Sequence, residues 1–329
     1  MPPTTQEPSL SVIVPTWNGR ELLAACLQAL RNSRGPAFEV VVVDDASSDG
    51  TWDWLSHQTD PRIRSLRNES NLGFARSMNK GFQLARGRWL VPLNNDTRVR
   101  PSFLEELVKC GESGFDMVAP RVLLAGGSEV DSAGVTPLRD GSSIERGRAR
   151  PAEAPELLAP TEVFGPSASA CLYSRRVLDA THGFDEDFYA YYEDVDLAWR
   201  ARHAGLRCMY WPAAVVEHRH SATWGRVSDR KLYLLERNRL WTLWKNYPFR
   251  WVAAEPVARF ITLAPLVARG PLGPEVGTGL RAMRLRRLAR ILGEADLAAW
   301  AGYPMMWRKR QRIWETSRLS RKELARWIR

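Results

Sequence analysis

Over the first hundred residues, short apolar runs alternate with segments of helical periodicity, and this alternation constrains the fold more than any other feature. Buried strands are predicted at 11–15, 38–43, 63–66 and 89–93, and helices at 21–30 and 74–86. Strands that alternate with helices indicate a parallel sheet covered on both faces, so the sequence predicts an α/β fold. From 121 to 164, repeated glycines and prolines predict long loops over the sheet.

Polar clusters follow three of the predicted strands, at 16–18, 44–45 and 94–96. In sheets of this kind, ligands bind beyond the carboxyl ends of the strands, at the points where the strand order reverses. The sequence therefore predicts that all three clusters lie where a ligand would bind.

Two of these clusters carry carboxylates. Asp44 or Asp45 can accept a hydrogen bond from a base N–H or a ribose hydroxyl, although a cap between strand and turn is the favoured interpretation on the residues alone. Asn94, Asn95 and Asp96 place a carboxylate beside two amides, which suits a hard cation such as Mg²⁺ or Mn²⁺. Such a cation would bridge diphosphate oxygens and neutralise a leaving group. A plain Asn/Asp turn explains this second cluster equally well.

Acidic and aromatic residues are densest over 183–200. Carboxyl groups in an aromatic setting are candidates for a general base with a raised pKa, and aromatic rings stack on the faces of sugars. Asp194 and Asp196 would also occupy the first turn of a helix predicted over 194–203, where the macrodipole favours anions. The alternative to a general base is therefore that these carboxylates cap the helix.

Two histidines, His218 and His220, lie in a basic pentapeptide that follows an apolar segment. A neutral imidazole there can complete a metal shell, and an imidazolium can meet a phosphate. A structural role explains these histidines equally well.

Taken together, these segments resemble the family 2 glycosyltransferases, in the order and at the spacing found in that family. The resemblance covers about residues 9–245 and points to the rhamnosyltransferase-like branch, which makes bacterial cell-surface polysaccharides. The motifs that carry it are SVIVPTWN at 11–18, VVVDDASSDGT at 41–51, NLGFA at 71–75 with Asn79 and Gly81, LNNDT at 93–97, and YEDVDL at 192–197.

The resemblance implies an A-type glycosyltransferase fold, which is a Rossmann-like, mostly parallel sheet flanked by helices. It also implies a nucleotide-diphosphate sugar donor, inversion at the anomeric carbon, and Mg²⁺ or Mn²⁺ as cofactor. From the branch, dTDP-rhamnose is the expected donor. The nucleotide-binding residues that the resemblance implies are Pro15, Thr16, Trp17, Asp45 or Asp44, Gly73, Arg76, Asn94 and Asn95.

For the chemistry, the resemblance implies that Asp194 is the general base, with Glu193 beside it, and that Asp96 is a metal ligand. His218 matches a histidine near the metal or the diphosphate, with His220 as the competing choice. Asn94 stands where the family's metal motif begins with Asp, which is common in this branch but weakens the expected metal affinity. One base suffices, because inversion needs a single displacement by the acceptor hydroxyl.

Charge divides the chain near residue 226. Residues 226–329 hold 23 Lys and Arg against 8 Asp and Glu, residues 1–225 hold 24 against 29, and half of the 14 tryptophans follow residue 225. We therefore divide the chain into a catalytic domain (1–225) and a basic, Trp-rich helical extension (226–329), with a helix predicted over 230–247. Tryptophan interleaved with Arg and Lys suits an anionic membrane interface. The alternative is an extension that packs on the catalytic domain and leaves a solvated basic face.

The expected acceptor is lipid-linked or a polysaccharide, and the expected location is cytoplasmic, peripheral at the inner face of the plasma membrane. The N-terminus lacks a signal-peptide pattern, and no apolar run of 18 residues lacks a charge or a proline. The four cysteines are widely spaced, as in a protein with reduced thiols.

Two other classes of protein are weighed against an enzyme. Nucleic-acid binding is disfavoured, because the sequence has no helix-turn-helix, zinc-finger or RNA-recognition signature and the catalytic domain is net acidic. The remaining alternative is a catalytically inactive relative that binds sugars or serves as a scaffold. The intact Asp45, Asp96 and Asp194 argue against that alternative.

Overall fold

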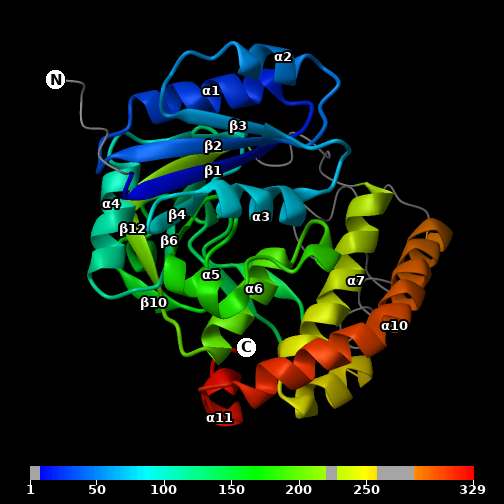
Figure 1. The fold of residues 1–329 in the computed structure, drawn as a ribbon. Helices are drawn as coiled ribbons and strands as arrows, with labels where there is room; N and C mark the ends of the chain where they lie inside the picture. Colours follow the sequence, from blue (N-terminus) through cyan, green and yellow to red (C-terminus); the bar gives the residue numbers. More distant parts are fainter. Residues whose placement is uncertain (1–7, 220–227, 258–284) are drawn as a thin grey trace.

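The four predicted strands form the parallel half of a ten-stranded sheet in the computed structural model, which describes residues 8–219, 228–257 and 285–329 (Figure 1). These strands are β1 (Leu10–Thr16), β2 (Phe38–Asp44), β3 (Ile63–Arg67) and β4 (Trp89–Pro92). Their spatial order is β4-β1-β2-β3, and each neighbouring pair is parallel. The predicted strands are confirmed, and their carboxyl ends lie at one edge of the sheet.

Helices cover both faces of this sheet, as predicted. They are α1 (Arg20–Arg31), α2 (Thr51–Ser56), α3 (Phe74–Leu84), α4 (Phe103–Glu112), α5 (Arg175–Thr181) and α6 (Glu193–His203). Val12 and Val14 of β1 pack in one core with α1 and α4, whereas Ile13 packs in a second core with α3, α5 and α6. Both faces of β1 are buried, which is why its sequence is a continuous apolar run rather than an alternating one.

The other half of the sheet is mixed. Its strands are β5 (Thr97–Val99), β6 (Met117–Leu124), β7 (Val130–Ser132), β10 (Thr161–Val163), β11 (Leu172–Ser174) and β12 (Cys208–His218). β11 is antiparallel to both of its neighbours, β4 and β6, and β12 runs parallel to β6. A separate two-stranded sheet joins β8 (Val135–Pro137) and β9 (Ser143–Glu145).

The expectation of long loops over 121–164 is wrong in part. β6 continues to Leu124, and β7, β8, β9 and β10 follow within the same region. These four strands have three residues each, which is too short for a period of two to appear in the sequence. Two short 3-10 helices complete the chain before α6, at Pro155–Leu157 and Glu186–Phe188.

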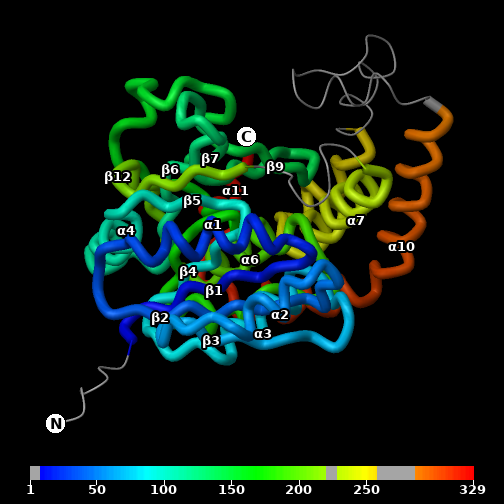
Figure 2. Tube along the Cα trace, turned by 90° about the horizontal axis from the view of Figure 1, so that it is seen from above, coloured from blue at the N-terminus to red at the C-terminus, as the bar shows by residue number. Residues whose placement is uncertain are grey.

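The described residues after position 227 are mostly helical, as predicted, and they pack against α6. Its helices are α7 (Asp229–Asn246), a helical stretch over 249–257, α10 (Leu285–Glu315) and α11 (Arg321–Ala325). Figure 2 shows α10 beside α7 at one side of the molecule. Leu240 and Trp244 of α7, and Tyr247 directly after it, share a core with Trp199 of α6 and Met306 of α10. Within the described ranges, no helix has the length and apolarity needed to span a bilayer.

Candidate active site

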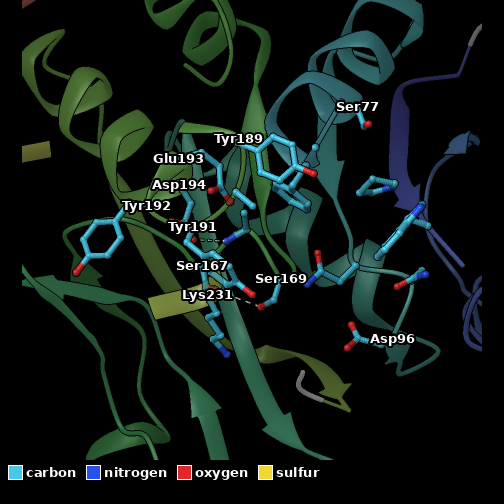
Figure 3. Close-up of a pocket in the computed structure, with 18 of the residues that line it drawn as sticks. Ser77, Asp96, Ser167, Ser169, Tyr189, Tyr191, Tyr192, Glu193, Asp194 and Lys231 are labelled. Atoms are coloured by element: carbon cyan, nitrogen blue, oxygen red, sulfur yellow. Dashed lines mark hydrogen bonds between the residues drawn. The ribbon is translucent and has the colours of Figure 1, made fainter. Parts of the chain in front are cut away.

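A cavity of about 420 Å³ opens at the carboxyl ends of β1, β2 and β4 (Figure 3). The predicted site residues that line it are Pro15, Thr16, Trp17, Asp45, Gly73, Asn94, Asn95, Asp96, Glu193, Asp194 and His218. Asp44 and Arg76 do not line it, and His220 lies outside the described residues. The fold therefore brings together residues from strand ends, helix starts and the end of β12 around a single space.

Asp45 shapes one half of the cavity through the backbone of the turn before α3. Its carboxylate accepts hydrogen bonds from the N–H of Leu72 at 2.8 Å, the N–H of Gly73 at 2.9 Å, and the Asn68 amide at 2.8 Å. Gly73 has a φ of 86°, and a Cβ added there would lie 2.4 Å from the ring of Tyr189. Only glycine allows both this backbone conformation and the contact with Tyr189.

Asp44 and Arg76 have other partners. Asp44 is fully buried, accepts from the Ser47 N–H and lies 3.4 Å from Arg67. Burial raises the pKa of Asp44. This geometry matches the strand-to-turn cap that the residues alone favoured. Arg76 lies on α3 and pairs with Glu186 at 3.2 Å, with about half of its side chain exposed.

The turn after β4 brings Asn95 and Asp96 to the opposite half of the cavity. The Asn95 amide donates to the Thr16 hydroxyl at 2.9 Å, which ties this turn to the end of β1. The carboxylate of Asp96 lies 3.2 Å from Nε2 of His218, the last residue of β12, and both side chains are 8% exposed. A carboxylate and an imidazole thus meet at the cavity wall.

Asp131 fixes the orientation of the His218 ring, although it belongs to none of the motifs recognised in the sequence. His218 Nδ1 lies 2.7 Å from the Asp131 carboxylate on β7, and Arg148 holds the other oxygen of that carboxylate at 2.6 Å. Burial lowers the pKa of His218, but the two carboxylates more than offset that effect and raise the pKa to about 9. Asp131 belongs to a three-residue strand, so no local pattern marks it.

The chemistry of this donor set fits a divalent cation such as Mn²⁺ or Mg²⁺. A carboxylate oxygen and an imidazole Nε2 are both metal-ligating atoms, and a carboxylate on Nδ1 is the usual second partner of a ligating histidine. Among the described residues, no group of three or more His, Cys, Asp or Glu side chains is placed to hold a metal ion. Asp96 and His218 would therefore supply part of a coordination shell that diphosphate oxygens complete.

Asp194 lies at the start of α6, half-buried in the cavity wall. Its carboxylate accepts from the Ala168 N–H at 3.0 Å and from the Val195 N–H at 2.7 Å. Burial raises the pKa of Asp194, and these backbone hydrogen bonds offset only part of that increase. Burial, followed by the charge of Asp194, raises the pKa of Glu193 well above its ordinary value. Among the described residues, Glu193 Oε2 has no hydrogen-bond partner.

Two further ionisable residues line the cavity without having been predicted. Glu145 of β9 accepts from the Ser132 hydroxyl, and burial raises its pKa to about 8. Lys231 of α7 lies against the Tyr191 ring, with Nζ at 5.5 Å from the ring centroid. Both come from parts of the chain where the sequence offered no motif, so only the tertiary structure brings them to the cavity.

Helix α6 is also held from behind by the C-terminal extension. Asp196 is fully buried and contacts Lys245 Nζ at 2.9 Å, the Asn246 amide at 2.8 Å and Arg200 Nε at 2.8 Å. Burial alone would raise the pKa of Asp196, but Lys245 and Arg200 hold it below the ordinary value. Asp196 is thus part of the connection between α6 and α7, and it does not line the cavity.

Comparison with known proteins bears on both the sequence and the fold. A model described as Glycosyl transferase family 2 matches residues 11–181. Succinoglycan biosynthesis protein ExoO of Rhizobium meliloti is 27% identical over 225 residues, which cover 65% of this chain and 61% of that protein. The chain spans less than two thirds of the length of this relative and of other curated relatives that it matches.

Two solved structures are similar over almost the whole chain. GalNAc-T7 with UDP, GalNAc and Mn²⁺ has a TM-score of 0.61 at 15% identity, over 91% of this chain and 59% of that one. Mannosyltransferase PcManGT from Pyrobaculum calidifontis, in complex with GDP-Man and Mn²⁺, has a TM-score of 0.52 at 18% identity, over 95% of this chain and 86% of that one. These similarities confirm the expected A-type glycosyltransferase fold.

Proposed function

The chain belongs to glycosyl transferase family 2, and from that premise we propose that it is an inverting, metal-dependent glycosyltransferase. It would move a sugar from a nucleoside diphosphate donor to a hydroxyl of its acceptor. One observation carries the proposal: a single cavity joins the strand-end residues Thr16 and Asp45 to the Asp96–His218 pair and to the carboxylate of Asp194.

In this proposal, Asp194 is the general base. An acceptor hydroxyl is a poor nucleophile until a carboxylate takes its proton, and a base works best when its pKa lies close to the working pH. The raised pKa of Asp194 moves it in that direction. Glu193 lies beside it, and burial together with the charge of Asp194 raises the pKa of Glu193, so the pair takes up a proton more readily than an isolated carboxylate.

The nucleotide would occupy the half of the cavity formed by Pro15, Thr16, Trp17 and Asp45, with Gly73 and the two asparagines of the 94–96 turn at its border. We assign base or ribose contact to Asp45 rather than to Asp44, because only Asp45 lines the cavity. Arg76 would need to break its pair with Glu186 to reach the nucleotide.

Asp96 and His218 would hold the cation, and Asp131 would keep Nε2 of His218 directed at it. When bound, Mg²⁺ or Mn²⁺ would neutralise the charge that develops on the diphosphate leaving group. The two similar structures with Mn²⁺ support this assignment.

We propose dTDP-rhamnose as the first donor to test, on the resemblance of the motifs to the rhamnosyltransferase-like branch. The acceptor would be a lipid-linked sugar or a growing polysaccharide, in line with a relative named for succinoglycan biosynthesis. The proposed division into a catalytic domain (1–225) and an extension (226–329) gives the extension the task of locating the enzyme.

The extension would bind the inner face of the plasma membrane from the cytoplasm. Helix α10 exposes 74% of Leu297 and 61% of Trp300, and Arg286, Arg287 and Arg290 are exposed on the same helix. Apolar and aromatic groups that insert between lipids, beside Arg that meets anionic headgroups, are typical of interfacial helices.

The deciding experiment is a donor-binding and donor-hydrolysis screen of dTDP-, UDP- and GDP-sugars with Mn²⁺, Mg²⁺ or EDTA. We expect one nucleoside diphosphate to bind with a metal and to lose affinity in EDTA. A folded protein that binds none of these donors under any condition would defeat the proposed function, and equal binding in EDTA would defeat its metal dependence.

A further inference from the structure

The segment between the second 3-10 helix and α6 is a loop of tyrosines in an uncommon conformation. Tyr189, Tyr191 and Tyr192 all have positive φ, at 66°, 68° and 67°. A bulky residue adopts this left-handed region only when the surrounding structure enforces it. All three tyrosines line the cavity, so the conformation of this loop, hereafter the tyrosine loop (188–192), is set at the candidate active site.

The carbonyl groups of the tyrosine loop show what enforces it. The Tyr189 carbonyl accepts from the Ala75 N–H of α3 at 3.0 Å, and the Tyr192 carbonyl accepts from the Asp196 N–H of α6 at 2.9 Å. The other three carbonyls of the loop turn toward α7. The loop is therefore fixed from three sides, by helices that are distant from each other in the sequence.

On α7, the side-chain amide of Asn238 contacts all three of these carbonyls. Its Nδ2 lies 2.9 Å from the Phe188 oxygen, 2.9 Å from the Ala190 oxygen and 2.7 Å from the Tyr191 oxygen, and its side chain is fully buried. Each of these carbonyls belongs to the peptide unit just before a tyrosine with positive φ, so the rotation at that φ sets the direction in which the carbonyl points. The contacts and the positive φ angles therefore depend on each other.

Arg237 reinforces the same contact. Its Nε donates to Oδ1 of Asn238 at 2.9 Å, which fixes the amide with its NH₂ group toward the loop. Its terminal nitrogen donates to the Phe188 oxygen at 3.1 Å and the Asp187 oxygen at 3.2 Å. Both Nδ2 and Oδ1 of Asn238 thus have hydrogen-bond partners, which determines the orientation of the amide.

The side chains of the loop reach both halves of the cavity. The Tyr189 hydroxyl and the Asn71 amide are hydrogen-bonded at 2.6 Å, and the Tyr189 ring covers Gly73, on the proposed nucleotide side. Tyr191 lies on the side of Asp194 and Lys231, as Figure 3 shows. A shift of the loop backbone would move both walls at once.

We propose that Asn238 is a positioning residue of the transferase: it holds the tyrosine loop in its left-handed conformation and so keeps the nucleotide wall and the base in register. Only the catalytic part of this inference rests on the proposed function, because the contacts between Asn238 and the tyrosine loop are a property of the fold. Misplacement of reacting groups by about 1 Å can cost about 100-fold in rate. We expect Asn238→Ala to lower kcat/KM to a similar extent.

The matched control is Thr242→Val, one helical turn further along α7. Thr242 is also fully buried, its hydroxyl has no hydrogen-bond partner among the described residues, and the change to valine keeps its shape. Two readouts are compared in the full-length protein: hydrogen exchange of backbone amides over 186–196, and transfer kinetics with the donor identified by the screen. Thr242→Val should leave both unchanged.

Faster exchange confined to 186–196, together with a loss of kcat/KM in Asn238→Ala alone, would support the inference. Unchanged exchange, or faster exchange without a loss of kcat/KM, would overturn it. If Asn238→Ala does not fold, Arg237→Met removes the second set of loop contacts and keeps an apolar stem, and the same two readouts decide. A wild-type protein that binds no nucleotide would defeat the proposed function. Hydrogen exchange would still test whether Asn238 holds the tyrosine loop.

Discussion

The carboxylate of Asp96 lies 3.2 Å from the imidazole of His218, although the two residues are far apart in the sequence. The pair forms because β5, directly after Asp96, is antiparallel to the end of β12, so that Thr97 is opposite His218. Arg219 also donates its N–H to the Asp96 carbonyl at 2.9 Å. Backbone pairing therefore sets the geometry of the proposed cation ligands before any ligand arrives.

The first prediction concerns the base. Asp194→Asn should reduce turnover by about 10²–10⁴-fold, because it removes proton transfer while keeping the volume and one of the two backbone hydrogen bonds to the side chain. Nucleotide affinity should stay within about twofold, since Asp194 lies outside the proposed nucleotide half. The exposed Asp179→Asn on α5 is the control for loss of a carboxylate. Steady-state kinetics with normal turnover in Asp194→Asn would remove this residue from the role.

A second prediction tests the residue behind His218. Asp131→Asn should weaken Mn²⁺ binding by about 10–100-fold, because the carboxylate on Nδ1 orients the ring and increases its basicity. Excess Mn²⁺ should restore most of the activity. A Mn²⁺ titration of nucleotide binding measures the effect, and an unchanged midpoint would argue against His218 as a ligand.

A third prediction links stability to pH through His203 of α6. Burial lowers the pKa of His203 to about 4, although the Asn246 carbonyl opposes that shift. Below about pH 6.5, His203 is protonated in the unfolded chain but stays neutral in the folded protein. The contribution of His203 to the free energy of unfolding is therefore fully present above pH 6.5. It falls by on the order of 3 kcal/mol as the pH decreases toward 4.

His203→Gln should flatten this part of the pH profile, whereas the exposed His57→Gln should leave it as in the wild type. Urea unfolding at intervals between pH 4 and 7.5 gives the comparison. Parallel profiles for His203→Gln and the wild type would exclude His203 as the source.

A fourth prediction concerns the ion pairs behind α6. Lys245 is 2% exposed and lies 2.5 Å from Asp185 and 2.9 Å from Asp196. Lys245→Met should cost up to about 3–5 kcal/mol of unfolding free energy, because two buried carboxylates lose the cation that they share and only Lys309 and Arg200 are left to neutralise them. The exposed Lys322→Met is the control, and denaturant melts provide the measurement. A loss below 1 kcal/mol would show that Lys309 and Arg200 are sufficient to neutralise the two carboxylates.

The last prediction tests the membrane-binding face. Leu297→Ser should weaken binding to anionic vesicles about tenfold, since burying a leucine side chain contributes about 1.5–3 kcal/mol. Leu158→Ser, which changes a leucine that is 46% exposed in the catalytic domain, should leave binding as it is. Co-sedimentation that is equal for both variants would move the membrane contact away from α10.

Much of the fold can be predicted from the sequence because its strands are buried on both faces. The runs at 11–15 and 38–43 are apolar without interruption, and no other environment suits such runs between amphipathic helices. The family and its A-type fold are confirmed, whereas the rhamnosyl branch stays a proposal. The sequence alone could not choose between Asp44 and Asp45, because adjacent side chains at the end of a strand point to opposite sides. Only the structure shows that Asp45 is the one that faces the cavity.

The rest of the site depends on contacts that leave no local pattern. Glu145 and Asp131 reach the cavity on three-residue strands, and Asn238 acts on backbone carbonyls, which every residue has. A motif search detects side chains that recur at fixed spacing. It cannot detect an amide on one helix that fixes the φ angles of a loop more than forty residues earlier in the chain.

The lysines that neutralise Asp185 carry a consequence for synthesis. Lys245 of α7 and Lys309 of α10 both contact this carboxylate, Lys309 at 2.6 Å. A chain emerging from the ribosome completes its N-terminal sheet first, while these acids still lack their cations. The region around α6 can thus reach its final packing only after residue 309 has been made, so the proposed active site would be completed later in synthesis than the sheet that carries it.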